Sequence, residues 1–566
     1  MKYNKIIILF FLLGSLAACK KLDSGLINPN AADPSSANVD LLLNSVQLSF
    51  TGVYGTASDI GATLTRQLAL TSGRDYKTAY TPEAFDGIWT TAYTGVIANA
   101  NALIPLALEQ KKYFQAGMAQ VLKAYILGTM VDYFGDVPNA EAGLGVEGNL
   151  NPVADPGAEV YTSVMALLDS AIANFAKTDA VAGPANDLYY AGSKTKWATA
   201  AKTLKLKFLM QTRLVDQANV TTKVTELLTA NDLIDDASED FVFRYGTNNS
   251  APDSRHPHYG TNYNDASTAN NSANDYLGNY FMWAIGYEKT AGVLSNLDPR
   301  RRYYFYRQTT NNAGVNSETS SCSIQAFPAH YPADMVFCLP GDGAAGYWGR
   351  DHGDASGTPP DGQLRTTYGI YPAGGEFDAS QSTSINNTRG GKGAGIDPVW
   401  MSSYTAFLEA EAALTLDITT AGTPRSLLET GIRASIAKVL AFPATVNVVV
   451  PDNRIPTQAA IDTYVDTVLK RYDRATTDAQ RLNIIMKEYY LAAWGNGIEP
   501  YNNYRRTGSP NNLQPVLTTP NPGFFIRSLF YPSVYKNRNS KAPAQKNPGT
   551  EANKVFWDNN PDDFIK

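Results

Sequence analysis

The sequence has little of what several common classes of enzyme and nucleic-acid-binding protein require. It contains only three cysteines and four histidines in 566 residues, with no H-E-x-x-H motif and no Cys/His set spaced to hold zinc. The net charge is −6 and 18% of the residues are charged, so the chain offers no basic patch for nucleic acid. It also lacks the G-x-S-x-G motif of many hydrolases. Nothing here argues for catalysis or for binding to DNA or RNA.

Three short motifs could take part in ligand chemistry, and each has a simpler explanation. The HPH motif at 256–258 can offer two metal ligands, but no further ligand set accompanies it. The loop at 351–354, with His352 between two aspartates, can bind a cation or a sugar hydroxyl; we favour a solvated loop cluster. The segment 341–346 matches G-x-G-x-x-G, but a proline precedes it and no helical pattern follows, which argues against a dinucleotide site.

Beyond the amino terminus, no apolar run is long enough to cross a bilayer, which needs about 20 residues. The amino terminus itself has Lys2 and Lys5, followed by the eight apolar residues 6–13. This run is too short for a spanning helix and is typical of a secretory signal. We therefore predict that the protein is exported and that its body does not cross the membrane.

Residues 16–19, Leu-Ala-Ala-Cys, resemble a bacterial lipobox, in which the cysteine thiol is acylated and the chain is cut before it. Acyl chains hold a protein on a membrane without a spanning helix. The alternative is an ordinary signal peptide cut after Ala18, with Cys19 incidental. We favour the lipobox with lipid attachment at Cys19. The sequence then divides into a signal peptide over 1–18, a lipidated flexible tether over 19–38 and a single domain over 39–566.

If Cys19 is acylated, two cysteines remain, Cys322 and Cys338. An exported compartment permits disulfides. In the chain-entropy model, a bridge that closes a loop of this length contributes roughly 3 kcal/mol of stability. We favour a disulfide between these two residues over a pair of free thiols.

Apolar residues recur at helical spacing in both halves of the chain. The predicted helices follow one another in pairs, with small residues where two helices would cross, as in a tetratricopeptide-like stack. We therefore predict a mainly α fold with four tetratricopeptide-like helix pairs as a scaffold. The pairs are 84–110 with 115–134, 158–177 with 194–216, 398–417 with 425–441, and 457–474 with 478–495.

The helical pattern disappears between about 240 and 395, between the second and third predicted pairs. So long an irregular stretch in a compact protein is usually functional or disordered. Its many aromatic residues argue against disorder, and binding residues concentrate on loops held by a rigid scaffold. We predict that this inserted, loop-rich region binds the ligand.

Distinctive motifs are spread along nearly the whole chain. They are NPNAADPSSANVDLLLNSV at 28–46, YILGTMVDYFGDVPNAEA at 125–142, DLYYAGSKTKWATAAKTLKLKFLM at 187–210, GIYPAGGEFD at 369–378, FLEAEAAL at 407–414, GNGIEPYNNYRRTGSP at 495–510, LFYP at 529–532 and VFWD at 555–558. Together they resemble the SusD/RagB nutrient-binding outer-membrane lipoproteins of Bacteroidota, in particular the SusD-like branch. Within the 495–510 motif, we interpret Arg505 and Arg506 as bracing the fold through charge-assisted hydrogen bonds.

The resemblance implies a helical scaffold of four tetratricopeptide-like pairs and a binding face built from loops. It also implies a partner, a SusC-like TonB-dependent outer-membrane barrel, over which the lipoprotein sits as a hinged lid. The protein would then be located at the outer membrane, held there only by its lipid anchor and facing the cell exterior. We expect no cofactor and no bound metal, although a structural calcium ion in the central loops stays an open alternative.

The main hypothesis is a non-catalytic glycan-binding lipoprotein that delivers oligosaccharide to the barrel. Three alternatives stay open: the same uptake role with oligopeptide cargo, a surface glycoside hydrolase, and a structural partner of the barrel with no ligand site. Sugar rings stack on flat aromatic faces, flanked by polar groups. The predicted ligand-binding residues are Arg74, Asp75, Tyr76, Tyr280, Trp283, Tyr347, Trp348, Arg350 and His352.

Overall fold

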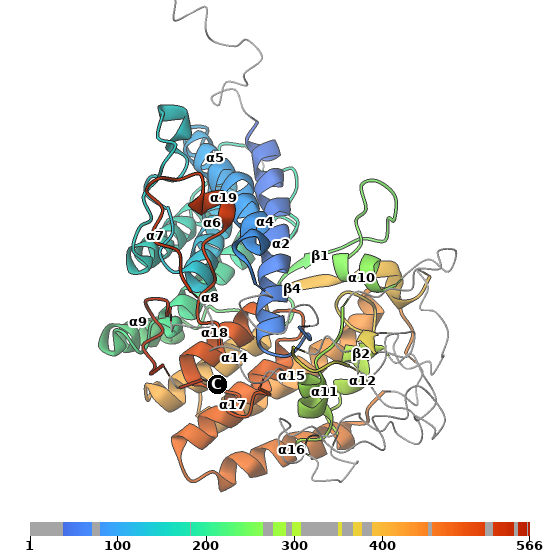
Figure 1. Cartoon of the computed structure of the whole chain (residues 1–566). Helices are drawn as coiled ribbons and strands as arrows, with labels where there is room; N and C mark the ends of the chain where they lie inside the picture. The colour runs from blue at the N-terminus through green and yellow to red at the C-terminus, as the bar shows by residue number, and fades with distance from the viewer. Residues whose placement is uncertain are drawn as a thin grey trace, which may run out of the picture.

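The protein is built from two groups of helices beside one long central helix (Figure 1). The computed structural model describes residues 38–70, 80–181, 183–263, 275–289, 297–306, 335, 349–353, 366–375, 388–450, 455–515, 525–547, 553–562 and 564–565. Within these residues the protein is mainly helical, and its strands form two two-stranded sheets. The predicted mainly α fold class is confirmed.

Helix α2 (Val39–Leu64) runs through the middle of the molecule and begins where the predicted tether ends. The side chain of Asn38 caps it by accepting hydrogen bonds from the backbone N–H groups of Asp40 and Leu41. Its buried side chains recur at helical spacing, and it packs against helices from both groups. This helix was not among those predicted.

The first helical group follows α2 in the chain. Its elements are η2 (Pro82–Phe85), α4 (Asp86–Thr90), η3 (Thr91–Ile97), α5 (Ala98–Glu109), α6 (Tyr113–Phe134), η4 (Leu144–Glu147), α7 (Gly157–Phe175), α8 (Lys194–Gln211) and α9 (Gln217–Ala230). Among the described residues, the run Pro82–Glu109 alone is long and apolar enough to cross a membrane. It packs against α2 and α6.

The second helical group lies toward the carboxyl end. It consists of α14 (Ser402–Thr415), α15 (Pro424–Thr445), α16 (Gln458–Arg474), α17 (Asp478–Ala492) and α18 (Ile498–Thr507), with the short α19 (Ser533–Lys536) packed on the first group. Capping boxes start two of these helices: Thr423 pairs with Ser426, and Thr477 pairs with Gln480. Consecutive helices α5 and α6, α7 and α8, α14 and α15, and α16 and α17 pack on one another.

The central region contains short elements rather than loops alone. The strand β1 (Phe241–Arg244) pairs antiparallel with β4 (Ile396–Trp400), and β2 (Phe305–Tyr306) pairs with β3 (Thr367–Tyr368). The predicted start of a helix at 398 is therefore wrong, because residues 398–400 belong to β4 and the helix begins at Ser402. Short helices complete the region: α10 (Pro257–Asn262), α11 (Asn279–Gly286), α12 (Arg301–Tyr304) and η6 (Gly390–Gly393).

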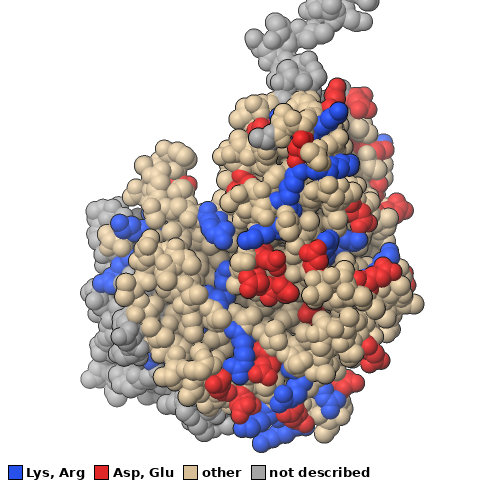
Figure 2. All heavy atoms as spheres, turned by 180° about the vertical axis from the view of Figure 1, so that it is seen from behind, with Lys and Arg blue, Asp and Glu red and all other residues tan. Residues whose placement is uncertain are grey.

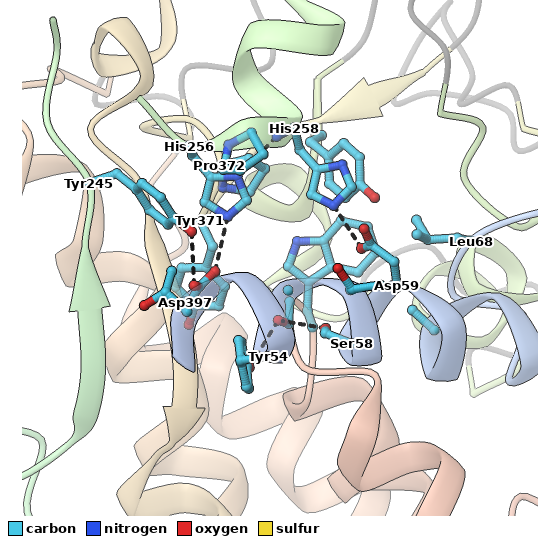
Figure 3. A pocket seen from close by; sticks show the side chains of 18 of the residues that line it. Tyr54, Ser58, Asp59, Leu68, Tyr245, His256, His258, Tyr371, Pro372 and Asp397 are labelled. Atoms are coloured by element: carbon cyan, nitrogen blue, oxygen red, sulfur yellow. Dashed lines mark hydrogen bonds and ion pairs between the residues drawn. The ribbon is translucent and has the colours of Figure 1, made fainter. Parts of the chain in front are cut away.

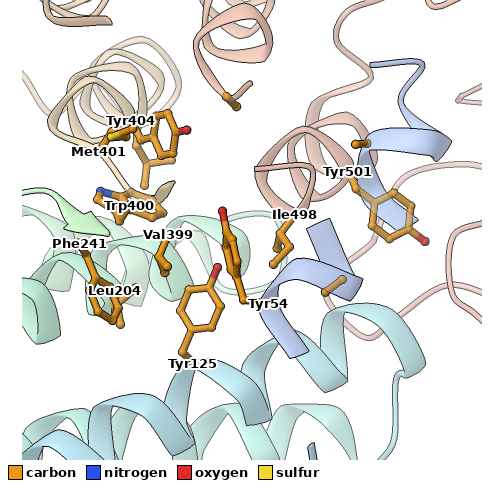
Figure 4. Close-up of a cluster of buried hydrophobic side chains, with 14 of the residues drawn as sticks. Tyr54, Tyr125, Leu204, Phe241, Val399, Trp400, Met401, Tyr404, Ile498 and Tyr501 are labelled. Atoms are coloured by element: carbon orange, nitrogen blue, oxygen red, sulfur yellow. The ribbon is translucent and has the colours of Figure 1, made fainter. Parts of the chain in front are cut away.

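One buried cluster joins the two helical groups to the β1–β4 sheet (Figure 4). Tyr54 from α2, Tyr125 from α6, Trp400 from β4 and Tyr404 from α14 are all fully buried there. Trp400 donates a hydrogen bond from Nε1 to Oγ1 of Thr405 at 2.9 Å, so its polar atom is satisfied inside the core.

A buried ion cluster ties the central region to the second helical group. Arg300 contacts Asp298 through Nη2 and Oδ2 at 2.6 Å and Glu488 of α17 through Nη2 and Oε2 at 3.1 Å. Lys289 reaches the same glutamate with Nζ 2.5 Å from Oε1, and the Tyr464 hydroxyl lies 3.0 Å from Oε2. These charged groups are buried together and paired, which is the condition under which buried charge is tolerated.

Basic and acidic side chains are interspersed on the face seen in Figure 2. The segment that follows β1 extends away from the body beside α2 in Figure 1, and a notch separates this projection from the helices in Figure 2.

Candidate functional site

A pocket of about 170 Å³ lies between α2 and the segment that leads into α10 (Figure 3). Residues from four parts of the chain line it: α2 and the turn after it, the central region, β4, and the turn after α17. The helical scaffold and the inserted region therefore meet at this pocket. Such junctions between structural units are common places for ligand sites.

One side of the pocket is closed by a histidine held between two carboxylates. Nε2 of His258 lies 2.7 Å from Oδ1 of Asp59 on α2, and Nδ1 lies 2.7 Å from Oδ2 of Asp275. Asn262 donates a further hydrogen bond to Oδ2 of Asp275 at 2.8 Å. Burial alone would lower the pKa of His258, but the two carboxylates raise it well above its usual value. His258 is therefore a cation at neutral pH that links α2 to the central region.

A second histidine stays neutral beside its own carboxylate. The backbone N–H of His258 donates to Nδ1 of His256 at 3.2 Å, which leaves the proton of His256 on Nε2, 3.5 Å from Oδ1 of Asp397. Burial lowers the pKa of His256 despite this neighbour. The Tyr245 hydroxyl donates to Oδ2 of Asp397 at 2.9 Å. Asp397 is thus fixed from both sides, as Figure 3 shows.

Aromatic rings form much of the pocket wall. The ring centroids of Tyr245 and His256 lie 4.7 Å apart, as do those of His258 and Tyr368. Trp494 stands behind Tyr368, with centroids 5.4 Å apart, and Tyr371 also lines the space. Rigid aromatic faces interspersed with polar groups suit the faces of sugar rings.

Gln67, in the turn after α2, brings a polar atom to the pocket. Its Nε2 donates to the carbonyl oxygen of Tyr490 at 3.0 Å, which orients the amide. Its Oε1 is buried and has no hydrogen-bond partner among the described residues. Because a buried polar group without a partner is costly, this oxygen is a candidate for contact with a ligand.

A second hollow, of about 540 Å³, lies between α15 and the β1–β4 sheet. Alanines of α15 and Phe442 form much of its lining, together with Arg244, Lys438 and the 235–238 turn. Lys438 is already paired with Asp240, with Nζ 2.5 Å from Oδ2. This hollow has fewer ring faces than the pocket beside α2, which we therefore take as the candidate site.

Two of the predicted ligand-binding residues pack inward from α11. Tyr280 and Trp283 are buried. The hydroxyl of Tyr280 donates to Oδ1 of Asn512 at 2.8 Å and accepts from Nζ of Lys487 at 2.6 Å; that Nζ also lies 5.5 Å from the Trp283 ring centroid. The structure thus brings Tyr280 and Trp283 together, but away from the pocket beside α2. Their role in ligand binding stays a prediction.

Arg350 and His352 are also buried, and neither lines the pocket. The guanidinium of Arg350 lies 4.6 Å from the ring centroid of Tyr276, and burial lowers the pKa of His352 well below its usual value. The other predicted residues lie outside the described part of the chain: Arg74, Asp75, Tyr76, Tyr347 and Trp348 of the ligand site, Cys19 of the lipid anchor, and Cys322 and Cys338 of the disulfide.

Several lining residues were missed because α2 was not predicted. Apolar residues recur there at helical spacing and are buried: Val39, Leu43, Val46 and Phe50. This spacing is the pattern from which the helix could have been predicted. Extending that helix would have placed Asp59 on it. The HPH motif does reach the pocket, but both of its histidines contact carboxylates. No group of three or more potential metal ligands occurs among the described residues.

Comparisons with known proteins identify the family. A family model described as "Starch-binding associating with outer membrane" matches residues 29–323, and a second, "Susd and RagB outer membrane lipoprotein", matches residues 374–558. No curated protein matches the chain significantly.

Solved structures share the fold at low sequence identity. A SusD/RagB family protein from Bacteroides thetaiotaomicron has a TM-score of 0.63 and 19% identity, over 93% of this chain and 100% of its own. A chitin-binding SusD homologue from Flavobacterium johnsoniae has a TM-score of 0.61 and 19% identity, over 92% and 100%. Since the two family models together cover most of the sequence and these structures match nearly all of it, the chain belongs to the SusD/RagB family of outer-membrane lipoproteins.

Proposed function

We propose that this protein is a non-catalytic, cell-surface lipoprotein that captures oligosaccharide and delivers it to a SusC-like TonB-dependent outer-membrane barrel as a hinged lid. Proteins of this family are binding proteins rather than enzymes. Some structural relatives are described as chitin-binding, which supports a glycan as the cargo.

The observation that carries the proposal is the pocket between α2 and the central region. It combines the rings of Tyr245, Tyr368 and Tyr371 with the polar groups of Asp59 and Gln67. An oligosaccharide presents apolar ring faces and many hydroxyl groups, and this combination of flat rings and hydrogen-bonding atoms matches both.

The histidines of the pocket favour binding over catalysis. Both ring nitrogens of His258 contact carboxylates, and His256 accepts from a backbone N–H while facing Asp397. A general acid or base needs a ring nitrogen within reach of the substrate. The hydrogen bonds of these histidines instead hold the pocket wall in position.

The position of α2 supports a tethered lid. The helix begins at Val39, directly after the predicted tether over 19–38, and it also lines the pocket through residues 51–62. One end of the body would thus be held near the membrane while the cargo site sits on the same helix. Flexible linkers allow such a body to swing about its anchor.

Isothermal titration of the purified protein against a glycan panel and a mixed peptide digest tests the proposal. We expect a measurable heat of binding with at least one glycan class and none with peptides. A heat of binding with peptides alone would assign oligopeptide cargo instead. New reducing ends that appear with the repurified protein would contradict a non-catalytic role.

A pocket-blocking variant locates the binding. Gly55 lines the pocket, and a Cβ added there meets no atom within 4 Å, so Gly55→Trp should place a large ring at the pocket. Gly87 on α4 is equally open and lies outside the pocket, so Gly87→Trp is the matched control. We expect glycan heat to be lost in the first variant and kept in the second. Equal heat in both variants would place the ligand elsewhere.

A further inference from the structure

The hydrogen-bond donors around the pocket are largely used inside the protein. The hydroxyls of Tyr54 and Ser58 donate to the carbonyl oxygens of Pro398 and Gly495, at 2.9 and 3.2 Å. Trp494 donates from Nε1 to the carbonyl oxygen of Ile370 at 3.2 Å. The Tyr245 hydroxyl and both ring nitrogens of His258 are committed to carboxylates. Tyr368 and Tyr371 also line the space, and a phenol can donate or accept.

The acceptors are less fully used. The side chain of Asp59 is 45% exposed, and its Oδ1 accepts from His258 while its Oδ2 has no hydrogen bond among the described residues. Gln67 Oε1 is a second acceptor without a partner in the described part of the chain. An incoming group that donates hydrogen bonds would satisfy both, whereas one that only accepts would satisfy neither.

The charges at the pocket also favour a ligand that donates hydrogen bonds. In the part of the chain that the structure describes, its lining includes Asp59 and Asp397 but no lysine or arginine. The cation His258 offsets only part of this charge, because Asp275 stands on its far side, and burial keeps His256 neutral. A carboxylate brought into this space would meet like charge in a partly desolvated site, whereas an ammonium group would meet opposite charge.

We infer that the pocket selects amine-bearing sugars, with Asp59 as the counter-ion of a 2-amino-2-deoxyhexose and Gln67 Oε1 accepting from the same residue or its neighbour. It rejects uronic acids and sulfated sugars, because their carboxylate and sulfate oxygens only accept hydrogen bonds and carry the wrong charge. Neutral sugars bind through their hydroxyls with lower affinity. This inference rests on the proposed function, because it names the class of glycan that the same pocket takes.

Calorimetry with matched oligosaccharides tests the selectivity in the full-length protein, purified in detergent. The probes are hexasaccharides with α-1,4 and β-1,4 backbones, each in a 2-amino, a neutral N-acetylated or hydroxyl, and a uronate form. We expect the 2-amino form of the preferred backbone to bind most tightly, the neutral form more weakly, and the uronate not at all. The advantage of the amine should shrink as the salt concentration rises.

Two variants separate the role of Asp59 from the loss of one carboxylate elsewhere in the protein. Asp59→Asn should cut the affinity ratio between amine and neutral forms by about 10-fold, since it removes a partly desolvated charge partner. Asp473→Asn removes an exposed carboxylate of α16 that does not line the pocket. In this control the ratio should stay within about twofold of the wild-type value. Thermal unfolding of each variant verifies that it is folded.

The outcomes distinguish a failure of the amine selectivity from a failure of the proposed glycan-binding function. Equal affinity for amine and uronate forms, or an equal loss of the ratio in both variants, overturns the selectivity and leaves the glycan-binding role standing. Absence of binding to every glycan in this panel and in the broader one overturns the proposed function, and the selectivity with it.

Discussion

Arg506 of α18 and Glu411 of α14 form a buried two-point ion pair, with Nε 2.8 Å from Oε1 and Nη2 2.6 Å from Oε2. Arg213, just after α8, adds its Nε at 2.8 Å from the same Oε1. Burial alone would raise the pKa of Glu411, but the two guanidinium groups lower it. Arg213 thus links the first helical group to this pair within the second group, as expected if Arg506 braces the fold.

Removal of this carboxylate should be costly. Glu411→Ala leaves two buried guanidinium groups without their shared partner, and we expect a loss of about 3–5 kcal/mol in the free energy of unfolding. The exposed pair between Arg425 and Asp473 is the control, since Asp473→Ala should change stability by at most about 1 kcal/mol. Chemical denaturation measures both. A Glu411→Ala variant as stable as the control would show that the ion pair does not brace the fold.

The His258 link should make stability depend on pH. The folded state raises the pKa of His258, so it binds the proton more tightly than the unfolded chain does, whose histidine titrates near about 6.5. The stabilisation is therefore complete below that pH and is lost as the pH rises through the raised value. We expect the stability difference between the wild type and His258→Gln to shrink from pH 6 upward, as measured by urea denaturation at each pH. A difference that grows with pH would contradict the link.

The crossing of α2 and α18 should tolerate no side chain at Gly497. A Cβ there would lie 2.0 Å from the carbonyl oxygen of Ser58 and 2.1 Å from the backbone nitrogen of Ala62. Gly497→Ala should cost at least about 3 kcal/mol, because backbone atoms have to move. At Gly52 of α2, an added Cβ meets nothing within 4 Å, so Gly52→Ala should stabilise by up to about 1 kcal/mol. Thermal unfolding of the two variants compares them, and equal melting temperatures would rule out the close crossing.

The lipid anchor at Cys19 predicts a simple localisation result. Cys19→Ala removes the thiol that would be acylated, and the body then has no acyl chain to hold it on the membrane. We expect the variant in the soluble fraction and the wild type in the outer-membrane fraction, with radiolabelled palmitate incorporated only into the wild type. Membrane retention of the variant without label would favour the ordinary signal peptide.

Strongly amphipathic helices could be predicted from the sequence with good boundaries. The expected helices 158–177 and 478–495 correspond to Gly157–Phe175 and Asp478–Ala492. The central helix α2 is hard to predict because Gly52, Gly55 and Gly61 weaken its helical pattern. The strand β4 is hard to predict because its partner is β1, more than 150 residues earlier in the chain. Local periodicity carries no information about such distant pairing.

The candidate site was harder to predict than the fold. The aromatic density near 276–287 was interpreted as a binding face, yet Tyr280 and Trp283 bury their rings, because large rings gain most from burial. The pocket instead depends on the meeting of Asp59 and His258, 199 residues apart in the chain. The residue types were visible in the sequence, but their proximity is a property of the fold.

Asp132 of α6 depends on residues that are translated much later. Its Oδ1 accepts from Nε1 of Trp557 at 2.9 Å, and its Oδ2 accepts from Nδ2 of Asn502 at 2.8 Å. A stop codon at position 557 would therefore leave a buried carboxylate in the first helical group without one of its donors. Division into separately expressed halves between 323 and 374 would remove both donors from α6. We expect the chain to stay dependent on chaperones until Trp557 has been translated.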